Sequence, residues 1–224
     1  GLPSSVHSTE KPVIRARRVC AESSGFSRTV ENAGDSTADV ALLKRSGILP
    51  ESNRSDGSHL FESETGELFM DTSRNFLSVN TPRLQGVCAE AGTTAELADF
   101  EIREMSRPGN LAVVAIDGMK PIREAERLTV VYATDALASG MECAGPEREV
   151  RFKAGGLPTL LRTGVFTVAL RNRQAEKLQL YPLDLAGNRL KKIEPVAVEG
   201  DRAVFRVDTA RDGVSLFFEV VAEK

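Results

Sequence analysis

The chain has 224 residues, of which 41% are hydrophobic and 27% are charged, and its formal net charge is −3. These proportions are ordinary for a soluble globular protein, and the length allows one large β-domain or one domain with an extension. An acidic chain without a basic stripe argues against a nucleic-acid partner. No apolar run approaches the roughly 18 residues of a membrane span, and the first residues do not resemble a signal peptide. Because the chain starts with Gly1, we expect a processed terminus or a fragment.

Cysteines and histidines are few and far apart: Cys20, Cys88, Cys143, His7 and His59. This spacing excludes a disulfide framework and argues against a zinc site. One cysteine pair could bridge, but we expect three free thiols buried as small hydrophobes. No cofactor is predicted. Loop carboxylates leave calcium as a weaker alternative, although no Asp-x-Asp-x-Asp-Gly loop is present.

Residues 1–60 are interpreted as an N-terminal extension or linker with one short helix. Residues 13–22 could form a strand, or a segment laid against another part of the protein. The helix is predicted at about 37–46, where Ser36 and Asp39 have the spacing of a capping box. Val40 and Leu43 would form its apolar face, and Gly47 is a natural residue at its C-terminal end.

Residues 62–90 predict three consecutive strands. The runs 68–70 and 76–79 are joined by a polar segment in which Asn75 can adopt a left-handed conformation, so they predict a hairpin. Residues 84–89 form the third run. Pro82 cannot donate a hydrogen bond to a strand pairing, and we therefore expect it at a strand start, a bulge or an edge. Gly66 indicates a tight turn before the first strand.

The remaining chain continues the strand pattern to its C-terminus. Strands are expected at 95–103, 111–116, 128–134, 140–143, 150–153, 166–171, 177–183, 189–198, 203–207 and 214–221. The runs 111–116 and 128–134 are apolar enough to be central strands, the first buried on both faces. Turn residues predict hairpins around Gly187 and Gly200. About a dozen short strands with frequent turns predict an all-β antiparallel sandwich over residues 61–224.

Carboxylates gather near the first strands: Glu62, Glu64, Glu67 and Asp71. Glycoside hydrolysis needs two acids about 5–10 Å apart. Glu67 and Asp71 are four residues apart on a strand, which places them roughly 13 Å apart on one face. We therefore expect solvated acids at strand ends. A complete small hydrolase that uses Asp56 and Glu62 is the weakest functional hypothesis, because nothing in the sequence indicates that these acids converge.

Sugar-binding modules commonly stack an exposed aromatic ring on the sugar. The chain has no Trp and two Tyr, so such a platform is hard to build. Phe26 and Phe61 lie in loop-like segments and are the remaining candidates. Arg83 follows Pro82 at the start of a strand. We expect it to pair with Glu64 or Glu67 and to hold the loop to the sheet, rather than to bind a ligand.

Several segments resemble the C-terminal β-sandwich region of large bacterial glycoside hydrolase-like proteins, whose catalytic part is a separate (β/α)-barrel. The matching stretches are Ser63-Glu64-Thr65-Gly66-Glu67-Leu68, Asn80-Thr81-Pro82-Arg83, 128–130 through 139–141, 156–164 and 180–184. The resemblance covers about residues 40–222. Glu64 stands where that family is expected to have Asp.

The resemblance implies a non-catalytic accessory domain, because the hydrolytic acids of that family lie in the barrel. It implies an exported bacterial parent protein, extracellular or periplasmic, that acts in polysaccharide degradation, with the barrel as partner. The motif residues Thr65, Gly66, Glu67, Thr81, Pro82 and Arg83 would then be structural, with ligand binding as their alternative role. No nucleic-acid or membrane partner is expected. The runner-up function is a carbohydrate-binding module for a polysaccharide.

Overall fold

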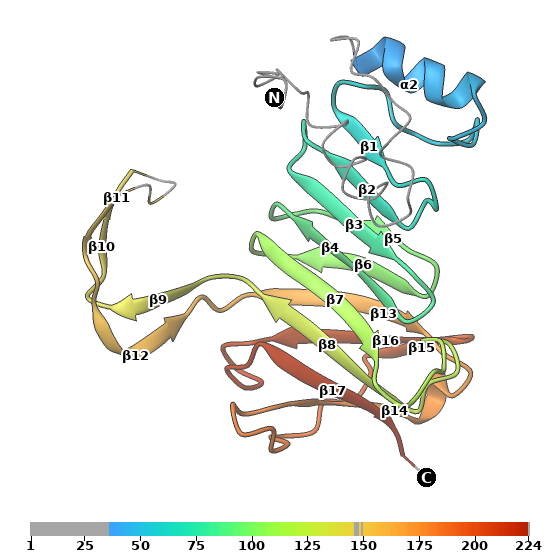
Figure 1. Cartoon of the computed structure of the whole chain (residues 1–224). Helices are drawn as coiled ribbons and strands as arrows, with labels where there is room; N and C mark the ends of the chain where they lie inside the picture. Colours follow the sequence, from blue (N-terminus) through green and yellow to red (C-terminus); the bar gives the residue numbers. More distant parts are fainter. Residues whose placement is uncertain (1–35, 146–147, 149, 224) are drawn as a thin grey trace. The chain divides into compact units, whose positions relative to one another are not determined.

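The computed structural model describes residues 36–145, 148 and 150–223. The expectations for residues 13–22, His7, Cys20 and Phe26 lie outside these residues. The chain divides into two compact units, one reaching Asn80 and one starting at Thr81 (Figure 1). This division falls later than residue 60, where the sequence suggested that the N-terminal extension ends.

The described residues contain 17 strands, one α-helix and one 3-10 helix, and the strands pair in antiparallel sheets. The all-β class is confirmed, with more strands than the dozen expected. The elements are α2 Ser36–Arg45, β1 Leu60–Glu62, β2 Leu68–Asp71, β3 Phe76–Asn80, β4 Leu84–Ala89, β5 Ala95–Glu96, β6 Phe100–Met105, β7 Gly109–Ala115, β8 Arg127–Ala133, β9 Ala136–Ser139, β10 Glu142–Ala144, β11 Val150–Lys153, β12 Gly156–Leu161, β13 Val165–Arg171, η1 Ala175–Lys177, β14 Leu178–Pro182, β15 Ala197–Glu199, β16 Arg202–Asp208 and β17 Phe217–Ala222.

The predicted helix is present in the first unit as α2. Val40 and Leu43 are buried with Leu49 and Phe61 in a small hydrophobic core. After the helix, Gly47 adopts φ +70°, which suits glycine, and its N–H donates to the Lys44 carbonyl. These observations confirm the apolar face and the glycine end. The side chain of the predicted capping residue lies outside the described side chains.

Strands β1, β2 and β3 form a meander in the first unit. Met70 lies opposite both Phe61 and Leu77, so one face of the meander shares the core with α2. Asn75 in the β2–β3 turn has φ 49°, the left-handed conformation expected from the sequence. The hairpin prediction for 68–70 and 76–79 is therefore confirmed. Strand β1 was missed, because three residues are too few to show a periodicity.

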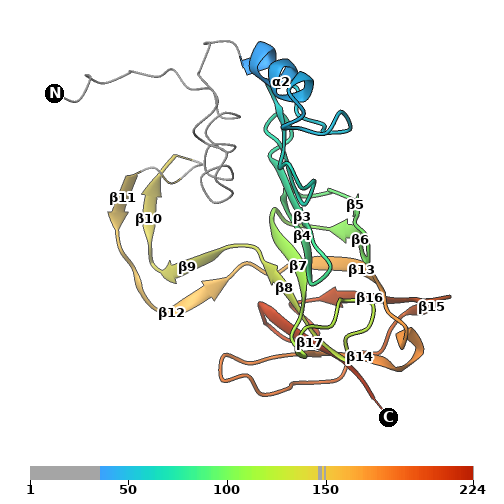
Figure 2. The ribbon, with the colours of Figure 1, turned by 45° about the vertical axis from the view of Figure 1, so that its right-hand side comes forward.

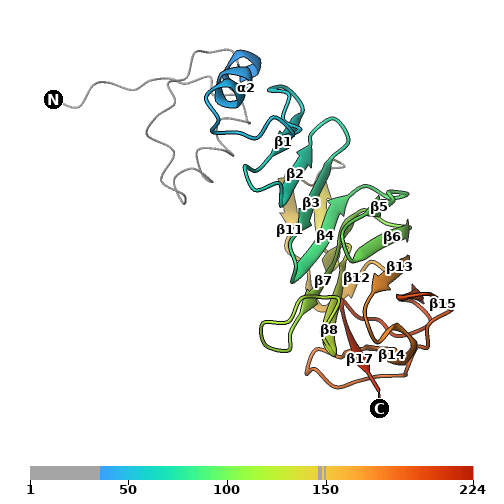
Figure 3. The same ribbon diagram turned by 90° about the vertical axis from the view of Figure 1, so that its right-hand side faces the viewer.

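The second unit is a β-sandwich. One layer contains β4-β7-β8-β17-β14 in this order, and the other contains β15-β16-β13-β6-β5. Figure 3 shows β4, β7 and β8 in one layer and β6 and β13 in the other. Rings from both layers meet in the core: Phe166 of β13 lies 5.1 Å from Tyr132 of β8 and 5.2 Å from Phe218 of β17. Edge-on contacts of this kind stabilise packed sheets.

Strand β7 differs from its prediction as a strand buried on both faces. Leu111, Val113 and Ala115 are buried, whereas the residues between them are only partly buried and Ile116 is exposed. The prediction of two-sided burial is therefore wrong. A central position in an antiparallel sheet pairs both edges of a strand, but it leaves one face without a covering layer.

The hairpin expected between 177–183 and 189–198 forms only in part. Strand β14 pairs along its length with β17, while segment 189–198 contributes isolated bridges, Leu180 to Ile193 and Leu183 to Arg189. The hairpin expected around Gly200 is present, because β15 pairs with β16. Strand β14 therefore pairs with β17, which is distant in the sequence, whereas β15 pairs with its neighbour β16 across a short turn.

A two-stranded arm leaves the second unit between β8 and β13. It consists of two successive ribbons, β9 with β12 and β10 with β11 (Figures 1 and 2). A Cβ on Gly155 would lie 2.7 Å from the Met141 nitrogen and from the Ser139 carbonyl oxygen, so the bend between the ribbons requires glycine. Strands β9 and β12 were missed, because Gly155, Gly156 and Pro158 indicate turns.

Candidate functional site

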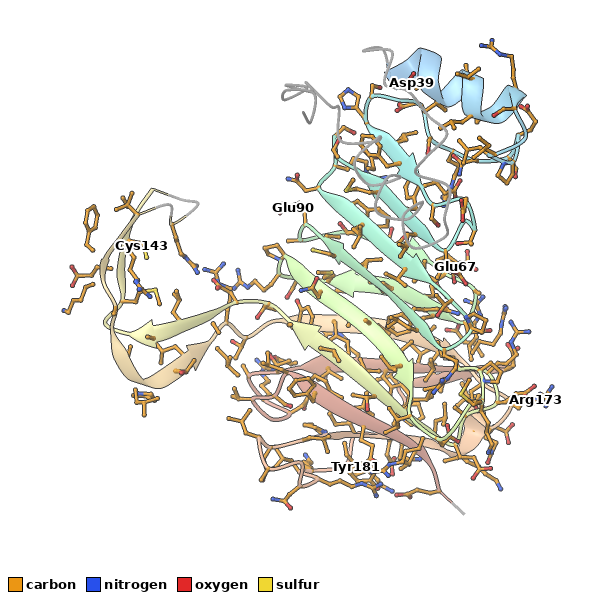
Figure 4. All side chains as sticks on the ribbon, viewed as in Figure 1. Asp39, Glu67, Glu90, Cys143, Arg173 and Tyr181 are labelled. Carbon is orange, nitrogen blue, oxygen red and sulfur yellow. The ribbon has the colours of Figure 1, made fainter. Side chains whose placement is uncertain are left out.

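The motif Thr65-Gly66-Glu67 forms the tight turn between β1 and β2. Gly66 has φ +74°, and its N–H donates to the Ser63 carbonyl at 3.0 Å. The Thr65 hydroxyl donates to Glu67 Oε2 at 3.2 Å, and the Ser63 hydroxyl accepts from the Leu68 N–H. Glu67 is exposed at this turn (Figure 4). These short-range bonds fix the turn and account for the threonine, the glycine and the glutamate.

The motif Thr81-Pro82-Arg83 precedes β4 in the second unit. Pro82 lies before the strand, as expected, and its carbonyl accepts from the Ile122 N–H at 2.8 Å. The Arg83 guanidinium donates to the carbonyls of Ala115 and Gly118, and also contacts the Met119 sulfur at 3.2 Å. Arg83 therefore ties the β7–β8 loop to the start of β4. Its pairing with a glutamate stays a prediction.

The carboxylate of Asp56 is held by the backbone of its own loop. It accepts hydrogen bonds from the N–H groups of Ser58, His59 and Leu60 at 2.7–2.9 Å. Burial alone would raise the pKa of Asp56, but these hydrogen bonds outweigh it and lower the pKa to about 2. An acid of this kind is ionised throughout the neutral range, which is the opposite of what a general acid needs.

Glu62 and Asp71 also have partners close by in the sequence. Arg54 donates to both Glu62 oxygens, from its backbone N–H at 2.6 Å and from Nε at 2.7 Å. Asp71 accepts from the N–H and the hydroxyl of Ser73 at 3.0 and 2.6 Å. Both carboxylates therefore support the loops beside β1 and β2.

The aromatic rings that are accessible in the structure are not the ones expected from the sequence. Phe61 is 5% exposed and belongs to the core of the first unit, so its proposal as an exposed sugar platform is wrong. Phe69 and Phe76, on the opposite face of the meander, are partly exposed with ring centroids 6.3 Å apart. The Arg54 guanidinium lies 3.9 Å from the Phe69 centroid. The alternation of side chains along a strand could have predicted this pair. Met70 lies opposite Phe61 on the core face, so the neighbouring Phe69 lies on the other face.

An ion cluster around the buried Glu219 of β17 was missed by sequence reasoning. Glu219 is 4% exposed and accepts from Arg127 on β8 and from Arg189 Nε, the latter at 2.6 Å. Burial acts to raise the pKa of Glu219, but hydrogen bonds from Arg189 and Arg127 and their charges outweigh it and lower the pKa. The same guanidinium of Arg189 lies over the ring of Tyr181 on β14, 4.8 Å from its centroid. The sequence contained one indication of this cluster, because Glu219 is the single acidic residue within the apolar run 214–221.

The outer face of the second layer carries another charged network. Arg103 on β6 bonds Glu101 and Glu199, and Arg202 on β16 bonds Glu101 and Glu96. Hydrogen bonds from Arg103, then its charge and that of Arg202, lower the pKa of Glu101. Alternating charges that bridge the four strands β5, β6, β15 and β16 stabilise pairing and register, so this network is structural.

Within the described residues, the structure shows the surroundings of two cysteines, Cys88 and Cys143, and of one histidine, His59. Cys143 is partly exposed on the arm (Figure 4), Cys88 is exposed on β4, and both thiols are free. The expectation that Cys88 is a buried small hydrophobe is therefore wrong. His59 is exposed, and no group of three or more His, Cys, Asp or Glu within residues 36–145, 148 and 150–223 is placed to hold a metal ion.

Comparisons with known proteins found no family model, curated protein or solved structure that matches the chain. Within the described part of the chain, no helix combines the length and the apolar character that a membrane crossing requires.

Proposed function

We propose that the chain is a non-catalytic accessory β-sandwich of a secreted bacterial glycoside hydrolase-like protein, which packs on or supports a catalytic barrel elsewhere in that protein. The sequence resemblance motivates this role. It is supported by one structural observation: the carboxylates first considered for hydrolysis hold the fold together. Asp56 is kept ionised by three backbone N–H groups, and Glu62 is held by Arg54.

The chemistry of glycoside hydrolysis sharpens this argument. Such enzymes need one carboxyl group that stays protonated near neutral pH and a second that is ionised. The pKa of Asp56 is lowered to about 2, far from a proton donor's range. Glu62 cannot reach a substrate without giving up its bonds to Arg54 at 2.6 and 2.7 Å. The geometry of these acids favours a supporting role.

A panel of plant and host polysaccharides tests the proposal. Hydrolysis and binding would be measured on the same samples, by reducing-end release and by isothermal titration. The accessory role predicts neither activity for the isolated chain. Hydrolysis that is lost in Glu62→Gln but kept in Glu64→Gln would contradict it. Folding of both variants would be checked by circular dichroism, because removal of the Arg54 partner perturbs a loop.

Carbohydrate binding is the second candidate, and the pair Phe69 and Phe76 favours it. Two partly exposed rings beside the guanidinium of Arg74, 5.9 Å from the Phe76 centroid, provide apolar area and hydrogen-bond donors on one face. Sugars bind to such combinations. Saturable binding in the titration that Phe76→Ala weakens at least about tenfold would support this function. Binding unchanged in Phe76→Ala would exclude this face.

A further inference from the structure

The thioethers of the four methionines differ widely in their exposure to solvent. Met105 lies in the core of the second unit and is 0% exposed, and Met70 is partly buried against the core of the first unit. Met141, on the arm, is also partly buried. Met119, in the loop between β7 and β8, is 83% exposed. Because an oxidant reaches a thioether from solvent, Met119 is the most accessible target among the four.

Hydrogen bonds between its two ends hold the loop of Met119 in place. The N–H of Ile116 donates to the Arg127 carbonyl at 3.1 Å. The Asp117 carboxylate accepts from the Glu126 N–H at 2.8 Å. Because both ends of the loop are joined in this way, the loop presents Met119 at a defined position on the surface.

The guanidinium of Arg83 lies against the sulfur of Met119. Its Nη1 donates to Met119 Sδ at 3.2 Å, and its Nη2 donates to the carbonyls of Ala115 and Gly118. Among the residues that the structure describes, the buried Nε of Arg83 has no acceptor. A guanidinium has five N–H donors, whereas a thioether is only a weak acceptor. Arg83 therefore offers Met119 a stronger donor than the sulfur can use.

We propose that Met119 is a site of reversible oxidation to methionine sulfoxide, and that Arg83 binds the sulfoxide oxygen. Hydrogen peroxide is the oxidant. A lone pair on the Met119 sulfur attacks one peroxide oxygen, the O–O bond breaks, and the second oxygen leaves as water after it takes the proton of the first. The sulfur loses two electrons and the peroxide gains them, so no further reactant is needed. This inference does not depend on the accessory role.

The contact with Arg83 gives this oxidation a stabilising direction. Oxidation of a buried methionine places a polar oxygen in an apolar core and disrupts it. Met119 is exposed, so its side chain can rotate to bring the new oxygen within hydrogen-bond distance of Arg83. A hydrogen bond from a charged donor is about twice as strong as a neutral one. Oxidation therefore strengthens the connection between the β7–β8 loop and Arg83, which directly precedes β4.

Peroxide treatment followed by peptide mass spectrometry tests the site. At low peroxide concentration, Met119 should be oxidised first, and at least about tenfold faster than Met105, which is fully buried. Met119→Leu should remove the fast phase and leave the rates of the other three methionines unchanged. Methionine sulfoxide reductases should reverse the modification. Oxidation of Met70 or Met141 before Met119 would overturn the proposal.

Hydrogen exchange in residues 116–121 tests the role of Arg83. Exchange in the native chain should slow about threefold after oxidation, and it should return to its original rate after reduction. Arg83→Gln should abolish this slowing. Lys120→Gln is the matched control, because Lys120 lies in the same loop and pairs with two carboxylates rather than with the sulfur. The slowing should persist in this control.

Met119→Gln provides a test without peroxide, since its amide oxygen imitates the sulfoxide oxygen. In the same residues, this variant should exchange about threefold more slowly than the unoxidised native chain. Faster or unchanged exchange, in this variant or in the oxidised native chain, would contradict the role of Arg83 and leave Met119 as a site of ordinary oxidative damage. Circular dichroism of each variant checks that the sandwich is folded.

Discussion

The buried carboxylate of Glu219 allows the sharpest test of how the sandwich is stabilised. The perturbation is Glu219→Gln, which keeps the size of the side chain and removes its charge. Glu219 lies on β17 between β8 and β14, where it joins Arg127 to Arg189. The variant therefore removes one anion that serves two cations from separate segments of the chain.

The expected loss of stability follows from burial and from partner exposure. Hydrogen bonds to charged groups contribute about 1.5–3 kcal/mol. Breaking a fully buried ion pair costs about 3–5 kcal/mol, because it leaves an unsolvated charge. Here the carboxylate is buried, but the side chains of Arg127 and Arg189 are 61% and 45% exposed, and water can solvate them after the change. We therefore expect a loss of about 2 kcal/mol in the free energy of unfolding.

Urea unfolding at pH 7, followed by circular dichroism because the chain lacks Trp, measures this loss. Glu194→Gln is the matched control, since Glu194 is 73% exposed and its pair with Lys192 spans 3.7 Å. Exposed pairs contribute at most about 1 kcal/mol. A Glu219→Gln variant within 0.5 kcal/mol of the native chain (on the order of a surface substitution) would refute the reasoning.

The same variant predicts a pH dependence. The pKa of Glu219 in the folded protein lies below its ordinary value of 4.5. Its contribution to stability is therefore fully present above pH 4.5 and is lost as the pH falls through the folded-state pKa. The difference between the native chain and Glu219→Gln should shrink below pH 4.5. A difference that stays constant through this range would mean that charge is not its source.

Asp135→Asn should loosen the arm by removing the carboxylate that binds Arg148, and hydrogen exchange in β10 and β11 should rise about 3- to 5-fold. Unchanged exchange would show that this ion pair does not hold the arm. Gly86→Ala should destabilise the sandwich by about 1–3 kcal/mol, because the new Cβ would lie 2.3 Å from the Cβ of Ala112 on β7. Gly156→Ala is the control: its new Cβ would meet no atom within 4 Å, and this variant should unfold at nearly the native temperature. Phe166→Ala should cost about 3–5 kcal/mol in urea unfolding, because the ring is fully buried between two others, and a loss below 1 kcal/mol (on the order of an exposed site) would contradict this core.

Local patterns predicted much of the architecture. The helix of the first unit followed from the apolar positions Val40 and Leu43 and from Gly47 at its end. The β2–β3 hairpin followed from the turn around Asn75, and the β15–β16 hairpin from Gly200. Each depends on residues close in sequence, so composition and periodicity carry enough information to place it.

The candidate site was harder to predict, because its residues gain their roles from partners. Phe61 looked like a loop aromatic, but it packs against the helix and is buried. Glu62 looked like an available acid, but Arg54 occupies both of its oxygens. No sequence pattern shows which donor a carboxylate will meet when the two lie on different elements. The structure therefore assigns these residues to the fold.

By itself, the sequence determined the all-β class, the short helix and the tight turns, because these depend on local backbone preference and on alternation of apolar residues. Only the tertiary structure decided that β14 pairs with β17, that Glu219 binds two arginines, and that strands β9 to β12 leave the second unit as an arm. These features join residues far apart in the chain, or expose apolar side chains that alternation alone would assign to a core. The physical reason is that pairing and burial are properties of the partner as much as of the segment.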